Sequence, residues 1–249
     1  MLAMADKYTF HQENFVIRAN EIDASGKITL SAIGNFFQEV AGNNARDLNF
    51  DITDLHKTKS TWVLYRMDIK IDEYPNWRDE ITLETWPASG DSFRALRNYQ
   101  IIDKNGKKLG CCLSYWLMID LVNRKPMRLP QTVLDTRFVD REHSLELKSN
   151  RFRPLEERTV IDEFKVRRSD LDMNNHVNNV NYITWMLECI PEDKLTDVHR
   201  FDIIYMNEGV LGDTIQVYTK IENELPIMIE LTKNESHTLA IAEISYRTA

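Results

Sequence analysis

The chain has 249 residues, of which 43% are hydrophobic and 28% are charged, and its formal net charge at pH 7 is −8. This length and composition are enough to bury one large core or two smaller ones, and they exclude a disordered chain. The negative charge and the lack of a basic stripe argue against nucleic acid and anionic membranes as partners. No apolar run is long enough to cross a bilayer and the first residues lack the features of a secretory signal, so we expect a soluble cytoplasmic protein.

The cysteines and histidines of the chain do not form a recognisable metal-binding or disulfide pattern. Cys111, Cys112 and Cys189 are odd in number, and two of them are adjacent in a strand-like run, which favours reduced thiols. No pair of cysteines or histidines has the spacing of a zinc site. We therefore expect no metal and no cofactor.

The first half of the chain predicts a strand, a helix and then further strands. Residues 15–23 alternate apolar and polar side chains and end in an acidic turn, whereas residues 28–40 carry apolar side chains at helical spacing. Strand-like sequence returns at residues 68–83. Two more strands are predicted at 93–103 and 109–121, with a Lys-Asn-Gly turn between them.

The same order of elements recurs in the second half, which indicates a duplication. The pattern F-x-[IV]-R-x-x-[DE]-[IL]-D of residues 15–23 is repeated at residues 164–172, 149 positions later. A second match pairs residues 68–83 with 202–217 at an offset of 134. The other elements predicted in this half are a helix at 180–190 and strands at 214–222 and 239–246.

The duplication predicts an α+β chain of two tandem domains, each an antiparallel sheet wrapped on a central helix. The stretch between the copies is rich in Arg, Glu and Pro and has weaker periodicity, as is typical of a linker. We place the first domain at residues 1–136, the linker at 137–156 and the second domain at 157–249.

The two copies differ most clearly after their shared aspartate. Asp23 is followed by Ala-Ser-Gly-Lys, whereas Asp172 is followed by Met-Asn-Asn-His. If this segment is extended, Asp172, Asn174 and His176 point to the same side, directly before the helix that starts near Val180.

These residue types suit acyl transfer, although they also suit a simple turn. Hydrolysis of a thioester needs an activated water or nucleophile and donors for the oxygen of the tetrahedral intermediate. Asp172 can serve as base or attacking carboxylate, His176 can shuttle a proton near neutral pH, and Asn174 with the helix amides can supply donors. Asn and Asp are equally typical of helix caps and turns, so the sequence leaves both interpretations open. A further carboxylate, Glu208, ends a strand-like run before a glycine and faces either a site or water.

The residues from Asp170 to Tyr182, together with the later Tyr205-x-x-Glu208, closely resemble two signatures of the acyl-acyl carrier protein thioesterase family. The resemblance covers nearly the whole chain, and in the first half it includes Trp62-Val63, Tyr74-Pro75-x-Trp77-x-Asp79 and Arg124-Lys125-Pro126. It implies a double hotdog fold in which only the second domain is catalytic.

The resemblance also implies catalytic roles for Asp172, Asn174, His176 and Glu208. Plant members of the family commonly carry a cysteine after the matched glutamate, and this chain has Gly209 there, so a cysteine nucleophile is not expected. Cys189 lies among apolar residues at helical spacing and is better explained as a small buried residue.

The activity that the resemblance implies is hydrolysis of fatty acyl-acyl carrier protein, which releases free fatty acid and ends chain elongation in fatty acid biosynthesis. The expected partner is an acyl carrier protein, and we expect a homodimer. The acyl chain is expected in the apolar interior of the first domain, which is rich in aromatic side chains: Phe36, Phe37, Trp62, Trp86 and Trp116. The alternatives are an acyl-coenzyme A thioesterase, a non-catalytic acyl-binding protein and, less favoured, a hotdog dehydratase.

Overall fold

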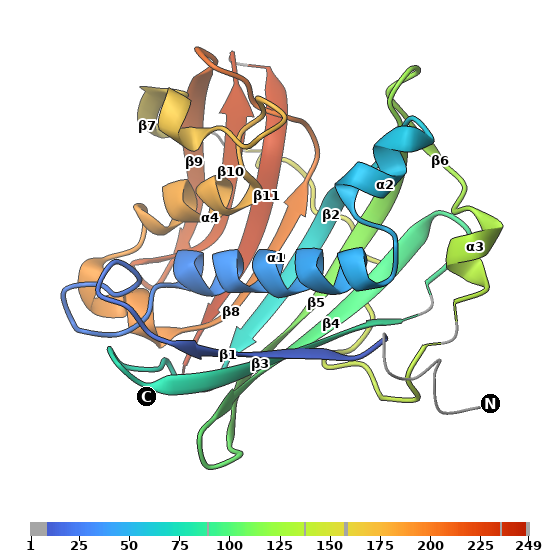
Figure 1. Cartoon of the computed structure of the whole chain (residues 1–249). Helices are drawn as coiled ribbons and strands as arrows, with labels where there is room; N and C mark the ends of the chain where they lie inside the picture. The colour runs from blue at the N-terminus through green and yellow to red at the C-terminus, as the bar shows by residue number, and fades with distance from the viewer. Residues whose placement is uncertain (1–8, 89, 137, 157–158, 235, 248–249) are drawn as a thin grey trace. The chain divides into compact units, whose positions relative to one another are not determined.

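The computed structural model describes residues 9–88, 90–136, 138–156, 159–234 and 236–247. The chain forms two compact units, residues 1–147 and 148–249 (Figure 1). The division falls inside the predicted linker, and residues 138–156 contain neither helix nor strand. Residues 137 and 157, which bound that linker and the second predicted domain, lie outside the described residues.

The first unit is an antiparallel sheet with a long helix packed against it. The strand order is β1-β3-β4-β5-β2, and β6 pairs with β5. Figure 1 shows α1 running across one face of this sheet. The elements are β1 (His11–Val16), α1 (Leu30–Asp47), α2 (Ile52–Lys57), β2 (Ser60–Ile71), β3 (Glu80–Ala88), β4 (Arg94–Asp103), β5 (Lys108–Asp120), β6 (Lys125–Met127) and α3 (Gln131–Leu134).

Helix α1 is set in place by a cap and by its apolar face. The Thr29 side chain accepts a hydrogen bond from the backbone N–H of Ala32 at 3.1 Å, which satisfies one of the unpaired amides at the helix start. Phe37 and Val40 are fully buried, and the Phe37 ring lies 4.8 Å from the ring of Tyr99 on β4. Burial of a side chain of this size contributes about 1.5–3 kcal/mol, so these contacts fix the helix on the sheet.

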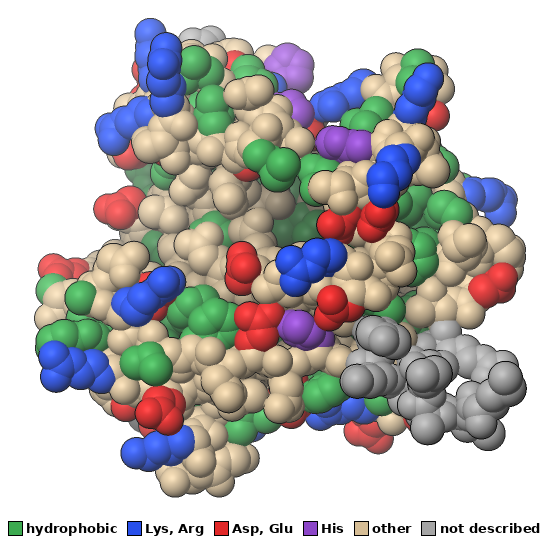
Figure 2. All heavy atoms as spheres, in the orientation of Figure 1, with side chains coloured by type: hydrophobic (Ala, Val, Ile, Leu, Met, Phe, Trp, Pro, Cys, Tyr) green, Lys and Arg blue, Asp and Glu red, His purple; other side chains and the backbone are tan. Residues whose placement is uncertain are grey.

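The outer side of the first unit is polar where α1 and β1 meet. Figure 2 shows acidic side chains and a histidine gathered there beside basic ones. The His11 Nε2 atom lies 2.6 Å from Glu13 Oε1, and its Nδ1 atom lies 3.6 Å from Asp47 Oδ2. This face is therefore hydrated, and the apolar face of α1 is left for the sheet.

The second unit repeats this architecture with a shorter helix. The strand order is β8-β11-β10-β9-β7, all antiparallel, and α4 packs against this sheet (Figure 1). The helix has 9 residues where α1 has 18, and this difference supplies the larger part of the shorter offset of the second sequence match. The elements are β7 (Val160–Lys165), η1 (Arg168–Asp170), α4 (Asn179–Leu187), η2 (Glu192–Asp197), β8 (Val198–Tyr205), β9 (Thr214–Glu222), β10 (Leu225–Lys233) and β11 (His237–Tyr246). The predicted α+β fold with one helix on each antiparallel sheet is confirmed.

One strand of the second unit, β10, was not predicted. Asn223 and Glu224 both have positive φ (50° and 66°), which is the geometry of a tight two-residue hairpin turn between β9 and β10. The strand pattern is obscured by Pro226, which lies next to a register shift, and by Glu230, which is fully buried. Glu230 accepts hydrogen bonds from the Leu155 backbone and the Thr238 hydroxyl, and a contact with such a distant partner is not visible in local sequence.

Among the described residues, no helix is long and apolar enough to cross a membrane. The longest, α1, carries polar and charged side chains along one side. The site described below lies on two loops of the second unit, residues 171–178 before α4 and residues 206–213 after β8. The sheet and the helix of this unit hold these loops in place.

Candidate active site

The segment from Asp172 to His176 forms a closed turn. The Asp172 N–H donates to the His176 carbonyl at 2.7 Å, and Asn175 adopts a positive φ of 61°. The carboxylate Oδ1 of Asp172 accepts hydrogen bonds from the backbone N–H groups of Asn174 (2.8 Å) and His176 (3.2 Å). Of the two interpretations that the sequence left open for the conformation of this segment, the structure shows the turn, because local side-chain to backbone bonds favour it.

The start of α4 follows this turn directly and is capped by Asn178. The Asn178 side chain accepts from the N–H of Val180 at 3.0 Å, and its carbonyl accepts from the N–H of Asn181 at 2.9 Å. These two amides are therefore already used as donors within the protein.

His176 and Glu208 come together although they are far apart in sequence. The Nε2 atom of His176 lies 3.5 Å from Oε2 of Glu208, and the two side chains are 26% and 40% exposed. A β-bridge between His176 and Val210 joins the turn to the loop that follows β8. The Asn174 side chain is exposed, and the structure gives it no contact with either residue. Of the four predicted site residues, the structure thus brings the side chains of His176 and Glu208 together, and the Asp172 carboxylate binds the backbone N–H groups of His176 and Asn174.

Glu208 is held by hydrogen bonds on both sides of its peptide group. Its carbonyl accepts from the Lys233 ammonium at 2.6 Å, and the next amide, the N–H of Gly209, donates to the Tyr182 hydroxyl at 2.9 Å. The Gly209 carbonyl in turn accepts from the N–H of Val177 at 2.9 Å. Burial raises the pKa of Tyr182 to about 12, against the bond from Gly209, so this phenol stays neutral at physiological pH.

Tyr182 and Lys233 were not singled out from the sequence as site residues. Tyr182 lies on α4 and Lys233 at the end of β10, so only the fold brings them to the loop after β8. Tyr182 belongs to the signature run that starts at Asp170, which is the one sequence signal that points to it. No local pattern marks Lys233.

Sulfur chemistry at this site is disfavoured by the surroundings. A Cβ atom on Gly209 would lie 2.9 Å from Cγ2 of Val177 and 3.3 Å from the Tyr182 hydroxyl, so a cysteine there requires a shift of Val177. Burial, with smaller effects of Asp162 and Glu188, raises the pKa of Cys189 to about 12, so its thiol is not a nucleophile at neutral pH. Within the described part of the chain, no three His, Cys, Asp or Glu side chains are grouped so that they could hold a metal ion.

The first unit contains the same loop network at the equivalent positions. The Asp23 N–H donates to the Lys27 carbonyl at 2.9 Å, and Asp23 Oδ1 accepts from the N–H groups of Ser25 and Lys27. The N–H of Ile28 donates to the Pro75 carbonyl, as Val177 does to Gly209. Asp23 and Asp172 therefore have the same structural task, which is to close the turn before the helix.

The side chains set on this shared frame are different. Where the second unit has His176 facing Glu208, the first has Lys27, whose ammonium donates to the carbonyl of Tyr74 at 3.2 Å. The tyrosine hydroxyl of Tyr182 has no counterpart, since Ile33 occupies its place in the first copy. Pro75 occupies the position of Gly209 in the first copy. Because proline has no backbone N–H, no hydroxyl is needed there as an acceptor. At these equivalent loops, the facing imidazole and carboxylate occur in the second unit and are replaced by Lys27 and Tyr74 in the first.

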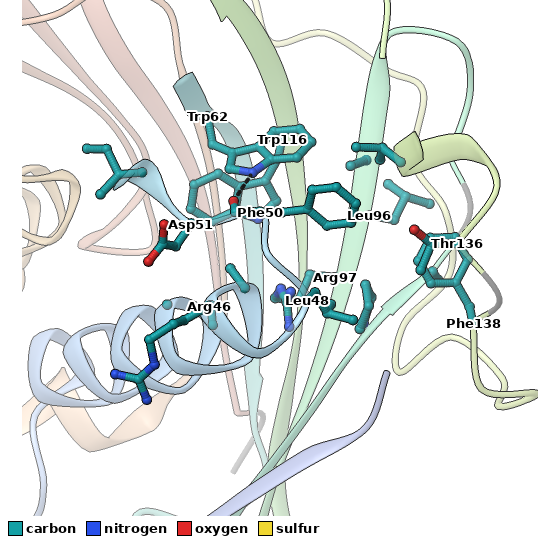
Figure 3. A pocket seen from close by; sticks show the side chains of 18 of the residues that line it. Arg46, Leu48, Phe50, Asp51, Trp62, Leu96, Arg97, Trp116, Thr136 and Phe138 are labelled. Atoms are coloured by element: carbon teal, nitrogen blue, oxygen red, sulfur yellow. Dashed lines mark hydrogen bonds between the residues drawn. The ribbon is translucent and has the colours of Figure 1, made fainter. Parts of the chain in front are cut away.

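The first unit instead contains an apolar cavity of about 370 Å³, a size typical of small-molecule sites (Figure 3). Its wall includes Trp62 and Trp116, and Figure 3 shows the bond from the Trp62 indole N–H to the Phe50 carbonyl, 3.0 Å long. The other aromatic residues singled out from the sequence are buried in the core of this unit and do not line the cavity: Phe36, Phe37 and Trp86.

Comparison with known proteins agrees with this division into two units. The family model for the acyl-ACP thioesterase N-terminal domain matches residues 8–136, and the model for the C-terminal domain matches residues 154–248. The oleoyl-acyl carrier protein thioesterase 2 of Arabidopsis thaliana is 30% identical over 97% of this chain and 74% of its own length. A second Arabidopsis oleoyl-acyl carrier protein thioesterase is 31% identical, and this chain spans 65% of it.

Solved structures show the same fold. The acyl-ACP thioesterase of Bacteroides thetaiotaomicron has a TM-score of 0.88 and 28% identity, with 96% of this chain and 98% of that chain covered. The 12:0-ACP thioesterase of Umbellularia californica shares the fold with a TM-score of 0.83 at 22% identity, over 96% and 97% of the two chains. The chain therefore belongs to the acyl-ACP thioesterase family, and it is a hydrolase of the thioester of fatty acyl-acyl carrier protein.

Proposed function

We propose that Glu208 and His176 form the centre at which water attacks the thioester, with Glu208 as the general base. The observation that carries this proposal is the 3.5 Å approach of the His176 imidazole to the Glu208 carboxylate. Both side chains are partly exposed, so water and substrate can reach them. Neither residue has a counterpart of its type in the first unit, whose equivalent loops are otherwise alike.

In this mechanism Glu208 removes a proton from water while the oxygen attacks the thioester carbonyl carbon. His176 orients the carboxylate and the water and can relay the proton to the departing sulfur. A C–O bond forms and the C–S bond breaks, which yields the free fatty acid and the thiol of the carrier protein's pantetheine arm. The Asn174 carboxamide, exposed beside the turn, is our candidate donor to the oxygen of the tetrahedral intermediate.

Asp172 has an indirect role in this proposal. Its Oδ1 atom is occupied by the N–H groups of Asn174 and His176, as that of Asp23 is in the non-catalytic copy. We therefore assign Asp172 to the positioning of His176 and Asn174, and the base to Glu208.

We further propose that the fatty acyl chain lies in the cavity of the first unit. Its lining is mainly apolar and includes Ala41, Leu48 and Trp116. Each buried CH₂ group of the substrate contributes about 0.8 kcal/mol, so the cavity can select chain length. Release of the acid ends elongation of the acyl chain, so the enzyme would catalyse the last step of fatty acid synthesis.

The test is thiol release from acyl-acyl carrier protein and from acyl-coenzyme A of the same chain lengths. Wild-type protein is compared with Glu208→Gln and with Lys27→Ala, the control at the position equivalent to His176. We expect preferential turnover of the carrier-protein esters, retained in Lys27→Ala and lost in Glu208→Gln. Equal turnover of both esters favours the acyl-coenzyme A thioesterase, and full activity of Glu208→Gln overturns the assignment of the base.

We also propose a cytoplasmic location and a homodimer. Cys111, Cys112 and Cys189 form no disulfide among the described residues, and Cys111 and Cys112 are buried thiols, which suits a reducing compartment. Cell fractionation tests the location.

Sedimentation equilibrium tests the dimer, and a mass of one chain at all protein concentrations would contradict it.

A further inference from the structure

The apolar cavity of the first unit contains a buried cation, Arg97. This residue lies on β4, lines the cavity and is only 9% exposed. Figure 3 shows its side chain near Leu48, between the strand and α1. A guanidinium stays charged in proteins, and burial of a charge in apolar surroundings is costly unless the charge is paired.

The partners of Arg97 among the described residues are neutral. Its Nη1 atom donates to Asn44 Oδ1 at 2.7 Å and to Thr85 Oγ1 at 3.2 Å. Within the described part of the chain, no carboxylate forms an ion pair with it. A guanidinium has five N–H groups, and these two bonds use only one of its nitrogens, so donors remain for another acceptor.

An unbranched hydrocarbon chain does not satisfy these donors. Where alkyl carbons cover the guanidinium, they displace its water and offer no hydrogen bond in return. A neutral oxygen on the chain, by contrast, costs much less to desolvate than a charged group does, and it gains a hydrogen bond from a charged donor. A carboxylate would have to lose its own hydration first, and buried ion pairs often recover no more than that cost.

We propose that this cavity selects acyl chains that carry a neutral oxygen, a hydroxyl or a ketone, at the depth of Arg97. The inference rests on the proposed place of the acyl chain and adds a substrate class to it. Arg97 is the specificity-determining residue, held in place by Asn44 on α1 and Thr85 on β3. Hydrogen bonds to charged groups of this kind correspond to a preference of about 10- to 100-fold in affinity.

The test measures binding without turnover by titration calorimetry. The ligands are pantetheine amides, in which an amide replaces the thioester, with either a plain chain or a chain of equal length hydroxylated at successive carbons. We expect one or two adjacent hydroxyl positions to bind about 10- to 100-fold more tightly than the plain chain. Equal or weaker binding of every hydroxylated ligand overturns the inference and leaves the proposed function intact. Binding of neither kind of ligand overturns the acyl site itself.

Two variants separate the role of Arg97 from a merely structural one. Arg97→Met keeps an unbranched side chain but removes its donors, so the preference should fall to about one while the plain chain still binds. Leu48→Ala, on the same cavity, should weaken both kinds of ligand alike and leave their ratio unchanged. A preference that survives Arg97→Met contradicts the proposal, and the ratio in the wild type remains a test if that variant does not fold.

Discussion

The turn at Asp23 and the turn at Asp172 share one backbone frame and differ in what they present. Each aspartate closes its turn with the same set of hydrogen bonds to the second and fourth amides along the chain. In the first copy the Lys27 ammonium at this turn binds the carbonyl of Tyr74, whereas in the second copy the His176 imidazole faces the Glu208 carboxylate. A residue kept in both copies is therefore explained by folding, and a residue that differs is a candidate for chemistry.

Among the changes that test this comparison, removal of the Glu208 carboxylate should have the largest effect on activity. Loss of a general base typically lowers the rate by about 10²–10⁴-fold, and we expect a fall in kcat of this size for Glu208→Gln. Thermal unfolding should be nearly unchanged, because the bonds that hold the loop are made by its backbone. Single-turnover kinetics with acyl-acyl carrier protein check the first point and calorimetry the second; a lower melting temperature would mean that the side chain also stabilises the fold.

The two aspartates provide a matched test of what is structural. Asparagine can still accept the turn's hydrogen bonds, so Asp172→Asn should retain at least a tenth of wild-type kcat, whereas Asp172→Ala should lose much more. Asp172→Ala and Asp23→Ala should each destabilise the protein by about 1–2 kcal/mol, the usual cost of a lost cap. Only the variant in the second copy should lose activity. If Asp172→Asn is as inactive as Glu208→Gln, the carboxylate of Asp172 takes part in the reaction.

The sequence predicted the duplicated order of elements, because each copy alternates and then changes period at the same place. It also predicted three of the residues that meet at the turn, since Asp172, Asn174 and His176 are close in sequence. It could not decide whether the segment is extended, because that depends on which amides the Asp172 carboxylate accepts. It also gave no sign of Lys233 or Arg97, whose roles depend on contacts with Glu208 and Asn44 from other elements.

A smaller effect is expected from loss of the Tyr182 hydroxyl, which has no counterpart in the first copy. Tyr182→Phe leaves the N–H of Gly209 without its acceptor, and a buried donor of this kind costs about 1–3 kcal/mol. The loop that carries Glu208 loses one of its supports, so we expect kcat to fall about tenfold while KM changes little. Ile33→Leu, at the equivalent place in the first copy, is the control and should leave kcat unchanged. An unaltered kcat in Tyr182→Phe would show that Lys233 and Val177 hold the loop without it.

The smallest effect concerns the room left at Gly209. In Gly209→Ala the new methyl group meets Val177 Cγ2 at 2.9 Å, and such overpacking typically costs about 1–3 kcal/mol. The additional change Val177→Ala removes that contact, so the double variant should regain stability relative to the sum of the single changes, which chemical denaturation can measure. Gly209→Cys should be destabilised in the same way, because its Cβ meets the same Val177 methyl group. We expect no gain in activity from the added thiol. Additive losses in the double variant would instead trace the strain to the Tyr182 hydroxyl, 3.3 Å from the same position.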